Sequence, residues 1–343
     1  MLVRRLSRAL LVNRSFLSSF NSSGRQEGAV DGMDGDGSSP TPQQLLAAVG
    51  AIIPPMSPSA HKGQAGRVGV VGGSLEYTGA PYFAATTALR CGADLAHVFC
   101  ARDAAAPIKA YSPELIVHPA LDCPDPMSEI SVWLPRLHSL LLGPGLGRRP
   151  QIFATLNHII QDAIDKQIPM VFDADALFYL NDNFDVLKGY RNVILTPNRV
   201  EFARLYRSVL KRDLRADDIE VENIEQLAKH LGVTILCKGQ TDIIVGDDVI
   251  LTCNVTGAPR RCGGQGDVLS GATALFYYWA HGTSVACHNT PLPLPAGPLA
   301  AWAAAALTRT AMKIAFKNTG RGTLTNDVLS IVPAAFSALF GNK

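Results

Sequence analysis

The residues best suited to chemistry in this 343-residue chain are three glycines and an aspartate that lead directly into an apolar helix. They read Gly263-Gly264-Gln265-Gly266-Asp267, followed by Val268-Leu269-Ser270-Gly271. Small residues before a helix let backbone N–H groups converge, and the helix start adds about half a positive charge. Such a site favours a phosphoryl group in transfer, and Asp267 would accept the proton of an incoming hydroxyl. The alternative is an ordinary glycine-rich turn with Asp267 as the helix cap.

A second candidate is Asn198-Arg199-Val200-Glu201, which follows the predicted strand Val193–Leu195 and Thr196-Pro197. Pro197 prevents an earlier helix start, and Asn198 or Thr196 can cap the helix that follows. Glu201 would then lie in the first helical turn, where a carboxylate could order the waters around Mg²⁺. A capping arrangement with a solvated Glu201 explains the same residues.

Two further segments follow predicted strands. In Lys238-Gly239-Gln240-Thr241-Asp242, the lysine could neutralise phosphate charge, although the segment could equally be a tight turn. Gly143-Pro144-Gly145-Leu146-Gly147-Arg148 has the spacing G-x-G-x-G, which differs from the G-x-G-x-x-G of dinucleotide-binding folds. We therefore expect this segment to be a glycine-lined ligand edge, not a Rossmann signature.

The elements that must position these residues alternate between β and α patterns. The predicted strands are Arg67–Val71, Leu95–Cys100, Leu115–Val117, Ser139–Leu142, Met170–Phe172, Val193–Leu195 and Thr234–Cys237, followed by a hairpin of Ile243–Val245 and Val249–Leu251. The predicted helices include Leu45–Ile53, Tyr82–Cys91, Ile152–Asp165, Glu201–Leu210, Ile224–Leu231, Val268–Trp279, Leu299–Ala315 and Leu324–Leu339. Strands that are apolar on both faces and separated by helices predict an α/β fold, with a mainly parallel central sheet flanked by helices on both faces. The loops after the strands should meet at one edge, where ligands bind.

Composition limits the kinds of partner. Hydrophobic residues make up 47% and the formal net charge is +2, which favours neither a nucleic-acid nor a membrane partner. No apolar run reaches the roughly 18 to 20 residues of a membrane-spanning helix, so we expect a soluble protein. The sequence leaves open whether the chain forms a homo-oligomer.

The N-terminal residues differ in kind from the rest. Residues 1–26 are rich in Arg, Ser and Leu and contain no acidic residue, which is typical of a mitochondrial transit leader, although a disordered basic tail has the same composition. Residues 27–41 read as a flexible linker of Gly, Asp, Ser and Pro, and residues 42–343 as one catalytic domain. We expect a mitochondrial protein, and a second start at Met33 would yield a cytoplasmic form.

In this order, the motifs resemble the ribokinase-like superfamily and, within it, the ATP- or ADP-dependent NAD(P)H-hydrate dehydratases. The N-x-x-E at Asn198–Glu201 and the G-x-G-D at Gly264–Asp267 are superfamily motifs. The dehydratase-type motifs are Gly72-Gly73-Ser74, Tyr77-Thr78-Gly79-Ala80-Pro81, Ser112-Pro113-Glu114, Gly143–Gly147 and Asp173-Ala174-Asp175-Ala176-Leu177. Taken singly, most of these are also ordinary connecting turns.

The resemblance implies a repair reaction on the S-epimer of hydrated NADH or NADPH. The enzyme would use a nucleotide to phosphorylate the ring hydroxyl, and phosphate would then be eliminated. ATP is the expected co-substrate, with Mg²⁺ as the cofactor, and Glu201 is the candidate metal residue through water. By matching position, the residues implied to bind the hydrate are Gly145, Asn198, Arg199, Val200, Glu201, Phe202, Ala203, Arg204 and Asp267. Those implied to bind ATP are Lys238, Gly239, Gln240, Thr241, Asp242, Gly257, Ala258, Pro259, Arg260, Arg261, Cys262, Gly263, Gly264, Gln265 and Gly266. Asp267 is the implied catalytic residue.

Two other functions are compatible with parts of the pattern. A small-alcohol kinase of the same superfamily, acting on a vitamin precursor or a sugar, would share Asp267 and Glu201 but would stop at the phosphate ester. A non-catalytic dinucleotide-binding protein would bind NAD(P) without nucleotide turnover. The second function leaves the combination of Asp267 with the glycine-rich run unexplained.

Overall fold

The computed structural model describes residues 40–286 and 294–341, so the predicted leader and most of the predicted linker lie outside the described residues. The chain from Pro40 onward forms one compact unit. Its strands are β1 (Arg67–Val71), β2 (Leu95–Phe99), β3 (Ile116–His118), β4 (Ser139–Leu142), β5 (Met170–Phe172), β6 (Val193–Leu195), β7 (Thr234–Cys237), β8 (Asp242–Gly246) and β9 (Val249–Cys253). They form a nine-stranded sheet in the order β3-β2-β1-β4-β5-β6-β7-β8-β9. Neighbouring strands from β3 to β7 are parallel, while β8 and β9 are antiparallel.

Helices connect the parallel strands and complete the C-terminal part of the unit. The α-helices are α2 (Pro42–Ile52), α3 (Gly79–Cys91), α4 (Arg102–Tyr111), α5 (Pro126–Ile130), α6 (Pro150–Asp165), α7 (Ala174–Asn183), α8 (Arg199–Leu210), α9 (Val221–Leu231), α10 (Gln265–Ala286), α11 (Ala296–Thr319) and α12 (Thr325–Phe340). Short 3₁₀ turns are η1 (Leu134–Arg136), η2 (Phe184–Leu187), η3 (Ala216–Asp218) and η4 (Gly320–Gly322).

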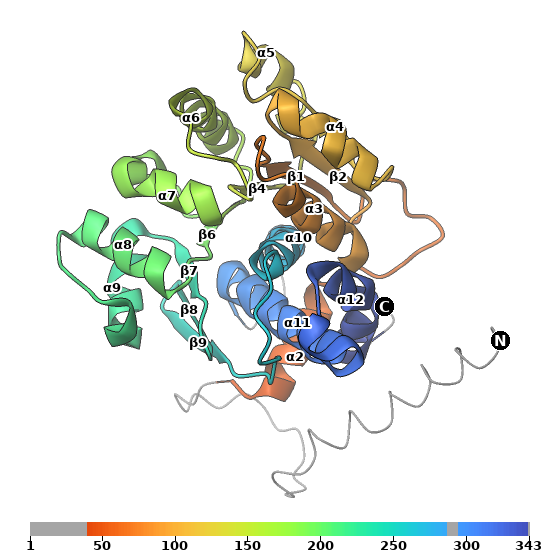
Figure 1. The fold of residues 1–343 in the computed structure, drawn as a ribbon. Helices are drawn as coiled ribbons and strands as arrows, with labels where there is room; N and C mark the ends of the chain where they lie inside the picture. Colours follow the sequence, from red (N-terminus) through yellow and green to blue (C-terminus); the bar gives the residue numbers. More distant parts are fainter. Residues whose placement is uncertain (1–39, 287–293, 342–343) are drawn as a thin grey trace, which may run out of the picture. The chain divides into compact units, whose positions relative to one another are not determined.

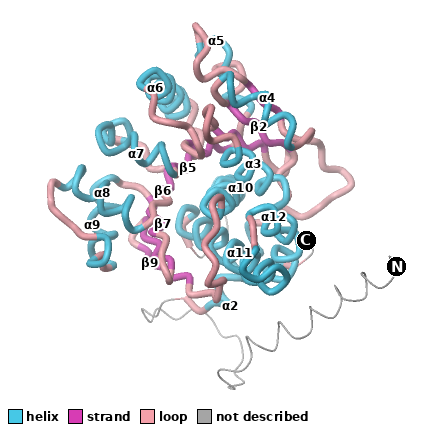
Figure 2. The backbone as a smooth tube through the Cα atoms, in the orientation of Figure 1, coloured by secondary structure: helices cyan, strands magenta, loops and turns pink. Residues whose placement is uncertain are grey.

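The sheet separates two apolar cores because alternate strand residues point to opposite faces. On β4, Leu141 joins a core built with α2, α3, α10, α11 and α12. Its neighbours Leu140 and Leu142 join the other core, built with α5 to α9. The two groups of helices lie on opposite sides of the strands (Figure 1), and the coloured tube shows the strands as a layer between them (Figure 2). The predicted mainly parallel α/β sheet with helices on both faces is confirmed.

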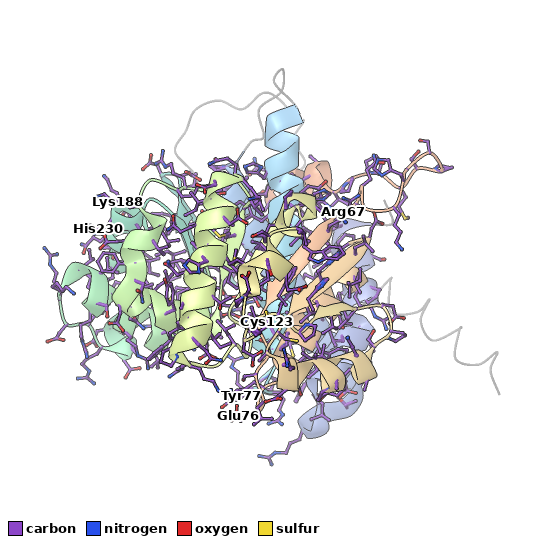
Figure 3. The ribbon with its side chains drawn as sticks, turned by 90° about the horizontal axis from the view of Figure 1, so that it is seen from above. Arg67, Glu76, Tyr77, Cys123, Lys188 and His230 are labelled. Carbon is purple, nitrogen blue, oxygen red and sulfur yellow. The ribbon has the colours of Figure 1, made fainter. Side chains whose placement is uncertain are left out.

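The strand order reverses between β1 and β4, and this reversal locates the ligand edge. The chain builds β1, β2 and β3 outward in one direction, then returns to add β4 beside β1 and continues the other way. Ligands in open parallel sheets bind beyond the carboxyl ends of the strands at such a reversal. Glu76 and Tyr77, from the loop after β1, lie at the opposite end of the molecule from Arg67, which begins β1 (Figure 3).

The structure differs from the predicted elements in two instructive places. Helix α4 was not predicted, because Pro107 inside it interrupts the helical pattern that the sequence shows. Helix α10 begins at Gln265, three residues before the predicted start at Val268, because the glycines that read as a turn already belong in part to its first turn. Strands β1, β4, β5, β6 and β7 have the predicted bounds.

Candidate active site

Two cavities border the start of α10. The first, of about 960 Å³, is lined by the segments 238–242 and 254–266 and by α11. The second, of about 820 Å³, is lined by the loops after β1 and β4 and by the starts of α4, α6 and α7. Gln265 and Gly266 line the first cavity and Asp267 lines the second. The first turn of α10 therefore stands between the two cavities, with its only carboxylate toward the second.

Most residues predicted to bind ATP line the first cavity. These are Lys238, Gly239, Gln240, Thr241, Asp242, Gly257, Ala258, Pro259, Arg261, Cys262, Gln265 and Gly266, together with Asn198. Arg260, Gly263 and Gly264 lie in the same segment but do not line the cavity. Gly264 has a φ of +92°, and a β-carbon there would lie 2.7 Å from the Phe83 ring. This glycine is required because the chain turns into α10 against a neighbouring side chain.

The second cavity is assembled from motifs that are distant in sequence. Ser74, Tyr77, Ala80, Gly145, Gly147 and Asp175 are among its lining residues. A β-carbon on Gly72 would lie 2.1 Å from the Pro144 carbonyl oxygen, so the loops after β1 and β4 touch at a position that only glycine allows. Asp175 accepts a hydrogen bond from the Gly147 amide at 3.0 Å and from Arg148 Nε at 2.8 Å. The loop after β5 thus supports the loop after β4.

The run from Asn198 to Arg204, predicted to bind the hydrate, occupies the start of α8 but contributes little to either cavity. Only Asn198 lines one, and it is the first cavity. Arg199 donates hydrogen bonds to the backbone carbonyls of Ala216, Asp217 and Ile219. Phe202 and Ala203 are buried in the core beneath α8, whereas Val200 is 59% exposed. The guanidinium of Arg204 lies 5.8 Å from the Phe178 ring. Arg199, Phe202 and Ala203 therefore hold α8 in place, while Val200 and Arg204 remain exposed.

Asn198 and Glu201 form the capping box that the sequence left open as an alternative. The Asn198 side chain accepts the Glu201 amide at 2.9 Å, and Glu201 Oε2 accepts the Asn198 amide at 2.8 Å. Asn198 also pairs with Lys238 as an isolated parallel bridge. The cap therefore fixes the Glu201 carboxylate beside the chain segment that carries Lys238.

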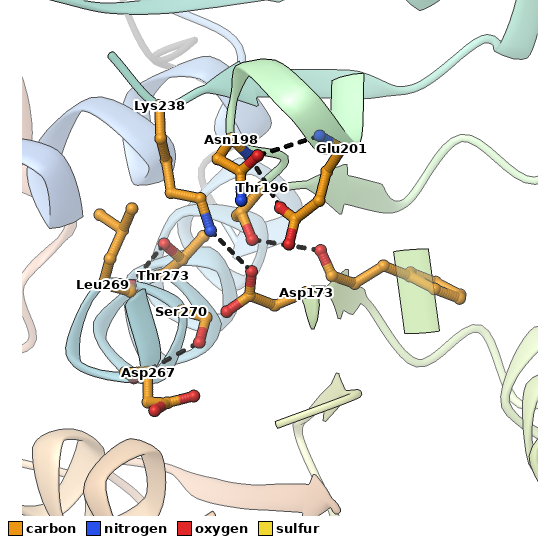
Figure 4. A network of polar contacts seen from close by, with 10 residues as sticks. Asp173, Thr196, Asn198, Glu201, Lys238, Asp267, Leu269, Ser270 and Thr273 are labelled. Carbon is orange, nitrogen blue, oxygen red and sulfur yellow. Dashed lines mark hydrogen bonds and ion pairs between the residues drawn. The ribbon is translucent and has the colours of Figure 1, made fainter. Parts of the chain in front are cut away.

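A charge network at the ends of β5, β6 and β7 lies beside the start of α10 (Figure 4). Lys238 Nζ donates to Asp173 Oδ1 at 2.8 Å, and the Asp173 side chain is only 3% exposed. A β-carbon added at Gly266 would lie 3.6 Å from Lys238 Nζ and 3.9 Å from Asp173 Oδ2. Lys238 therefore places its positive charge against the glycine backbone that opens α10, next to the amide groups of the helix start.

The same network perturbs the protonation of its carboxylates. Burial, with a further contribution from the negative charge of Asp173, raises the pKa of Asp267 well above its ordinary value, and Lys238 opposes this shift. Burial also raises the pKa of Glu201, again against the effect of Lys238. Burial alone would lower the pKa of Lys238, but Asp173, Glu201 and Asp267 outweigh it and raise that pKa. A carboxylate with a raised pKa at a cavity wall is suited to accept a proton.

Asp267 is placed for this role and not for capping. It lies inside the first turn of α10, whereas a capping side chain belongs to the residue before the first turn. Within residues 40–286 and 294–341, no group of three or more His, Cys, Asp or Glu side chains forms a ready metal cage. Mg²⁺ commonly uses one or two carboxylates, several waters and substrate phosphates. The oxygen donors of Asp173 and Glu201, on either side of Lys238, fit such an open site.

Two functional positions were not identified as ligand or positioning residues from the sequence. Asp173 was recognised only as part of a motif, and its ion pair with Lys238 joins positions 65 residues apart. Arg309 lies in α11 and lines the first cavity. A basic residue within an apolar helix needs a buried partner, and this was the signal that could have indicated Arg309. The motif Ser112–Glu114, in contrast, lines neither of these cavities, and Ser112 donates a hydrogen bond to Glu114.

The chain is similar to known proteins over most of its length. Residues 68–334 match the family model described as NAD(P)H-hydrate dehydratase. A Homo sapiens protein named ATP-dependent (S)-NAD(P)H-hydrate dehydratase is 48% identical over 299 residues, covering 87% of this chain and 85% of the human protein. A protein of the same name from Ixodes scapularis is 49% identical over 308 residues, covering 87% and 95%.

Solved structures show the same fold. The ADP/ATP-dependent NAD(P)H-hydrate dehydratase of Bacillus subtilis, co-crystallised with ATP and Mg²⁺, superposes with a TM-score of 0.64 at 21% identity, covering 86% of this chain and 97% of that chain. A ribokinase-like superfamily protein from Enterococcus faecalis has a TM-score of 0.68 at 19% identity, with 87% and 95% covered. The fold is ribokinase-like, and the family-model match over most of the folded unit is decisive: this chain belongs to the NAD(P)H-hydrate dehydratase family.

Proposed function

We propose that this chain restores NADH and NADPH from the S-epimer of their hydrated forms, using ATP. The observation that carries the proposal is the position of Asp267. Its carboxylate lines the second cavity while the two residues before it line the first. A hydroxyl in the second cavity and a phosphoryl group in the first would therefore meet at one helix start. Close approach of two bound reactants is a large source of rate enhancement.

The reaction has two balanced stages. In the first stage, the oxygen of the ring hydroxyl attacks the γ-phosphorus of ATP while Asp267 accepts the hydroxyl proton. The bond between that phosphorus and ADP then breaks. The lone pair of the ring nitrogen then expels phosphate, and loss of a proton from the adjacent ring carbon forms the double bond of NADH. Phosphorylation is needed because hydroxide leaves poorly and phosphate leaves well. ADP and phosphate are the co-products.

The chain's own residues would assist the transfer in three ways. Lys238 and the amides at the start of α10 would stabilise the negative charge on the moving phosphoryl group. Asp173 would hold Lys238 in place through their 2.8 Å contact. Mg²⁺ would neutralise phosphate charge when bound, held by ATP and through water by Glu201. The Asn198 cap would fix the orientation of Glu201.

The hydrate would occupy the second cavity, with Gly145 and Asp267 among its contacts. Tyr77 is 60% exposed beside this cavity, which leaves an aromatic surface available to a ring. For the run 198–204, we retain Asn198 and Glu201 as functional through the charge network and assign Arg199, Phe202 and Ala203 to holding α8 in place. Val200 and Arg204 are exposed and stay candidates for contact with the hydrate.

We also propose that residues 1–26 direct the protein to mitochondria, with residues 27–41 as a linker before the catalytic domain at 42–343. The leader composition supports this proposal. Among the described residues, no helix is both long enough and apolar enough to cross a membrane. Fusing residues 1–41 to a fluorescent protein tests the idea: mitochondrial fluorescence is expected, and diffuse cytoplasmic fluorescence from this fusion would contradict it.

The dehydratase assay is direct. Purified protein is mixed with ATP, Mg²⁺ and hydrated NADH, and absorbance at 340 nm is followed together with ADP release. A rise in absorbance matched by ADP release is expected. A small-alcohol kinase would release ADP and leave a stable phosphate ester without the rise at 340 nm. A binding protein would release no ADP.

A further inference from the structure

Arg309, in the middle of α11, connects parts of the first cavity that are separate in the sequence. Its side chain is only 14% exposed, although it lies on a helix whose neighbouring residues are mostly apolar and buried. A buried guanidinium is costly unless its N–H groups are hydrogen-bonded. The partners of Arg309 therefore indicate what the residue does.

All the recorded partners of the Arg309 guanidinium belong to two cavity segments. Nε donates to Asp242 Oδ2 at 2.7 Å. Nη1 donates to the carbonyl oxygens of Gln240 at 3.0 Å and Val255 at 3.3 Å, and Nη2 donates to that of Gly239 at 3.0 Å. These bonds hold the 239–242 turn against the chain after β9. The two segments are more than ten residues apart in the sequence because the β8–β9 hairpin lies between them.

Two further contacts make this arrangement rigid. Asp242 Oδ1 accepts a hydrogen bond from the Gly239 amide at 2.9 Å. The carboxylate that pairs with Arg309 therefore also closes the 239–242 turn, whose backbone carbonyls accept hydrogen bonds from Arg309. A β-carbon at Gly257 would lie 3.7 Å from Arg309 Cγ, so the chain after β9 also packs along the side-chain stem of Arg309. Gly239, Gln240, Asp242, Val255 and Gly257 all line the first cavity together with Arg309.

We propose that Arg309 is a positioning residue for the nucleotide, which holds the 239–242 and 255–257 segments in the shape that accepts ATP. The inference rests on the proposed function in that it takes ATP to occupy the first cavity. Its chemistry requires arginine. A planar guanidinium can serve a carboxylate and three carbonyls at once, whereas the single ammonium of lysine cannot reach all four. Arg309 acts by preorganising the binding surface, which lowers the ordering cost of binding.

The test compares Arg309→Met with the unaltered chain in two measurements. The first is the Kd for the ATP analogue AMP-PNP, by calorimetry, with no hydrated NADH present. The second is steady-state kinetics with each substrate varied in turn. Removing the Arg309 guanidinium should raise the Kd for AMP-PNP and the KM for ATP by roughly 10- to 100-fold. We expect kcat to change by less than about 3-fold and the KM for hydrated NADH to stay the same, because Asp267 and the second cavity remain intact.

Two controls separate positioning from general stability. Arg207→Met makes the same chemical change at a side chain that is 62% exposed on α8, and it should leave both constants unchanged. Trp302→Phe removes another hydrogen bond from α11, to the Thr252 carbonyl at 3.2 Å, but Trp302 does not line the first cavity. This variant should lower Tm without raising the KM for ATP selectively.

The outcomes either support the inference or overturn it. A normal Kd for AMP-PNP in Arg309→Met overturns it, as does a parallel rise in both KM values of the kind that general destabilisation would produce. If Arg309→Met does not fold, Arg309→Lys keeps the charge opposite Asp242 and should show an intermediate Kd, and an unaltered Kd in that variant would overturn the inference. Because AMP-PNP binding needs no hydrate, a failed 340 nm assay in the unaltered chain would refute the proposed function alone.

Discussion

The first cavity is built from two stretches that are nearly continuous in sequence, whereas the second is built from short pieces that follow four strands, β1, β2, β4 and β5. Residues 238–242 and 254–266 supply almost the whole wall of the first cavity, and α11 closes it. The second cavity takes single residues or short runs from the regions 74–80, 101–103, 145–152 and 174–175. The comparison shows why the residues that line the first cavity are easier to group from sequence than those that line the second.

The two cavities also differ in charge. Lys238, Arg261 and Arg309 line the first, with Asp242 as its only acid. The second contains Arg148 and Arg149 but also four acids, Glu76, Asp103, Asp175 and Asp267. A polyphosphate is therefore better matched to the first cavity, and a ligand rich in hydroxyl groups to the second. The predictions below test this division by altering the shared boundary and then each side in turn.

Asp267→Asn should have the largest effect because Asp267 lines the second cavity next to the two residues that line the first. We expect kcat to fall by roughly 10²- to 10⁴-fold, the usual contribution of a positioned general base. The Kd for AMP-PNP should remain near normal, since Asp267 does not line the first cavity. Asp182→Asn, at an exposed position on α7, is the control. A near-normal kcat in Asp267→Asn would remove this residue from the mechanism.

The pH dependence of kcat provides a second test of Asp267. Because burial and Asp173 raise its pKa, the carboxylate loses its charge at a higher pH than an ordinary aspartate would. Activity should therefore be full above this raised pKa and fall as the pH is lowered through it, well above pH 3.8. A pH profile of kcat checks the position of the acid limb, and a limb near the ordinary aspartate value would contradict the shift.

Lys238→Met alters the first cavity where it meets the start of α10. It removes the positive charge beside the start of α10, and kcat/KM for ATP should fall roughly 10²-fold. It also leaves the buried Asp173 unpaired, which should cost about 3–5 kcal/mol of the free energy of unfolding, as breaking a buried ion pair usually does. The double variant Lys238→Met/Asp173→Asn should recover part of that stability in urea unfolding. No recovery would mean that the ion pair is not the source of the loss.

Gly145→Ala tests the second cavity alone. Gly145 has a φ of +59°, and a β-carbon there would lie 2.6 Å from the Tyr77 carbonyl oxygen, so the two loops must separate. We expect the KM for hydrated NADH to rise about 10-fold through this loss of geometry, with the Kd for AMP-PNP unchanged. Gly189→Ala is the matched control, because Gly189 also has a positive φ, of +81°, but has no neighbour within 4 Å of an added β-carbon. Equal effects of the two substitutions would mean that backbone strain, not loop separation, is responsible.

The smallest effect is expected far from the boundary, at a histidine pair on β2 and β3. His97 Nδ1 and His118 Nε2 lie 3.0 Å apart, and burial lowers both pKa values to about 4. The unfolded chain binds protons near pH 6.5 and the folded chain only near pH 4, so stability is lost as the pH falls between these values. We expect a loss of about 1–2 kcal/mol for His118, reduced because its ring is only partly buried.

His118→Phe should make the free energy of unfolding less sensitive to pH in this window without changing kcat at neutral pH. The ring already stacks on Phe99, with centroids 4.6 Å apart, so phenylalanine should fit. Urea unfolding at pH 7 and pH 5 measures the difference. If the two proteins lose equal stability between these pH values, other groups cause the acid sensitivity.

The two signals at α8 and α10 show how far local sequence can be used. At α10, three glycines and an acid before an apolar run predicted a polarised helix start, and the structure has this start. At α8, the N-x-x-E pattern predicted a carboxylate for Mg²⁺ or a helix cap with a solvated Glu201. The structure shows the cap at Asn198, with a half-buried Glu201 bonded back to it. Both patterns are local, so the sequence could predict hydrogen bonds between residues within four positions of each other. The run Asn198–Arg204 was assigned to the hydrate as a whole by resemblance, and a linear motif does not show that Phe202 and Ala203 face the core.

The sequence by itself determined the order of strands and helices, the parallel sheet and the polarised start of α10, since each depends on residues close together in the chain. Only the tertiary structure decided that Lys238 pairs with Asp173 across 65 positions and that Arg309 holds Gly239 across 70. It also decided that the loops after β1 and β4 touch beside Asp267. Such contacts depend on crossover packing and strand order, which bring distant residues together, and no local pattern of side chains specifies them.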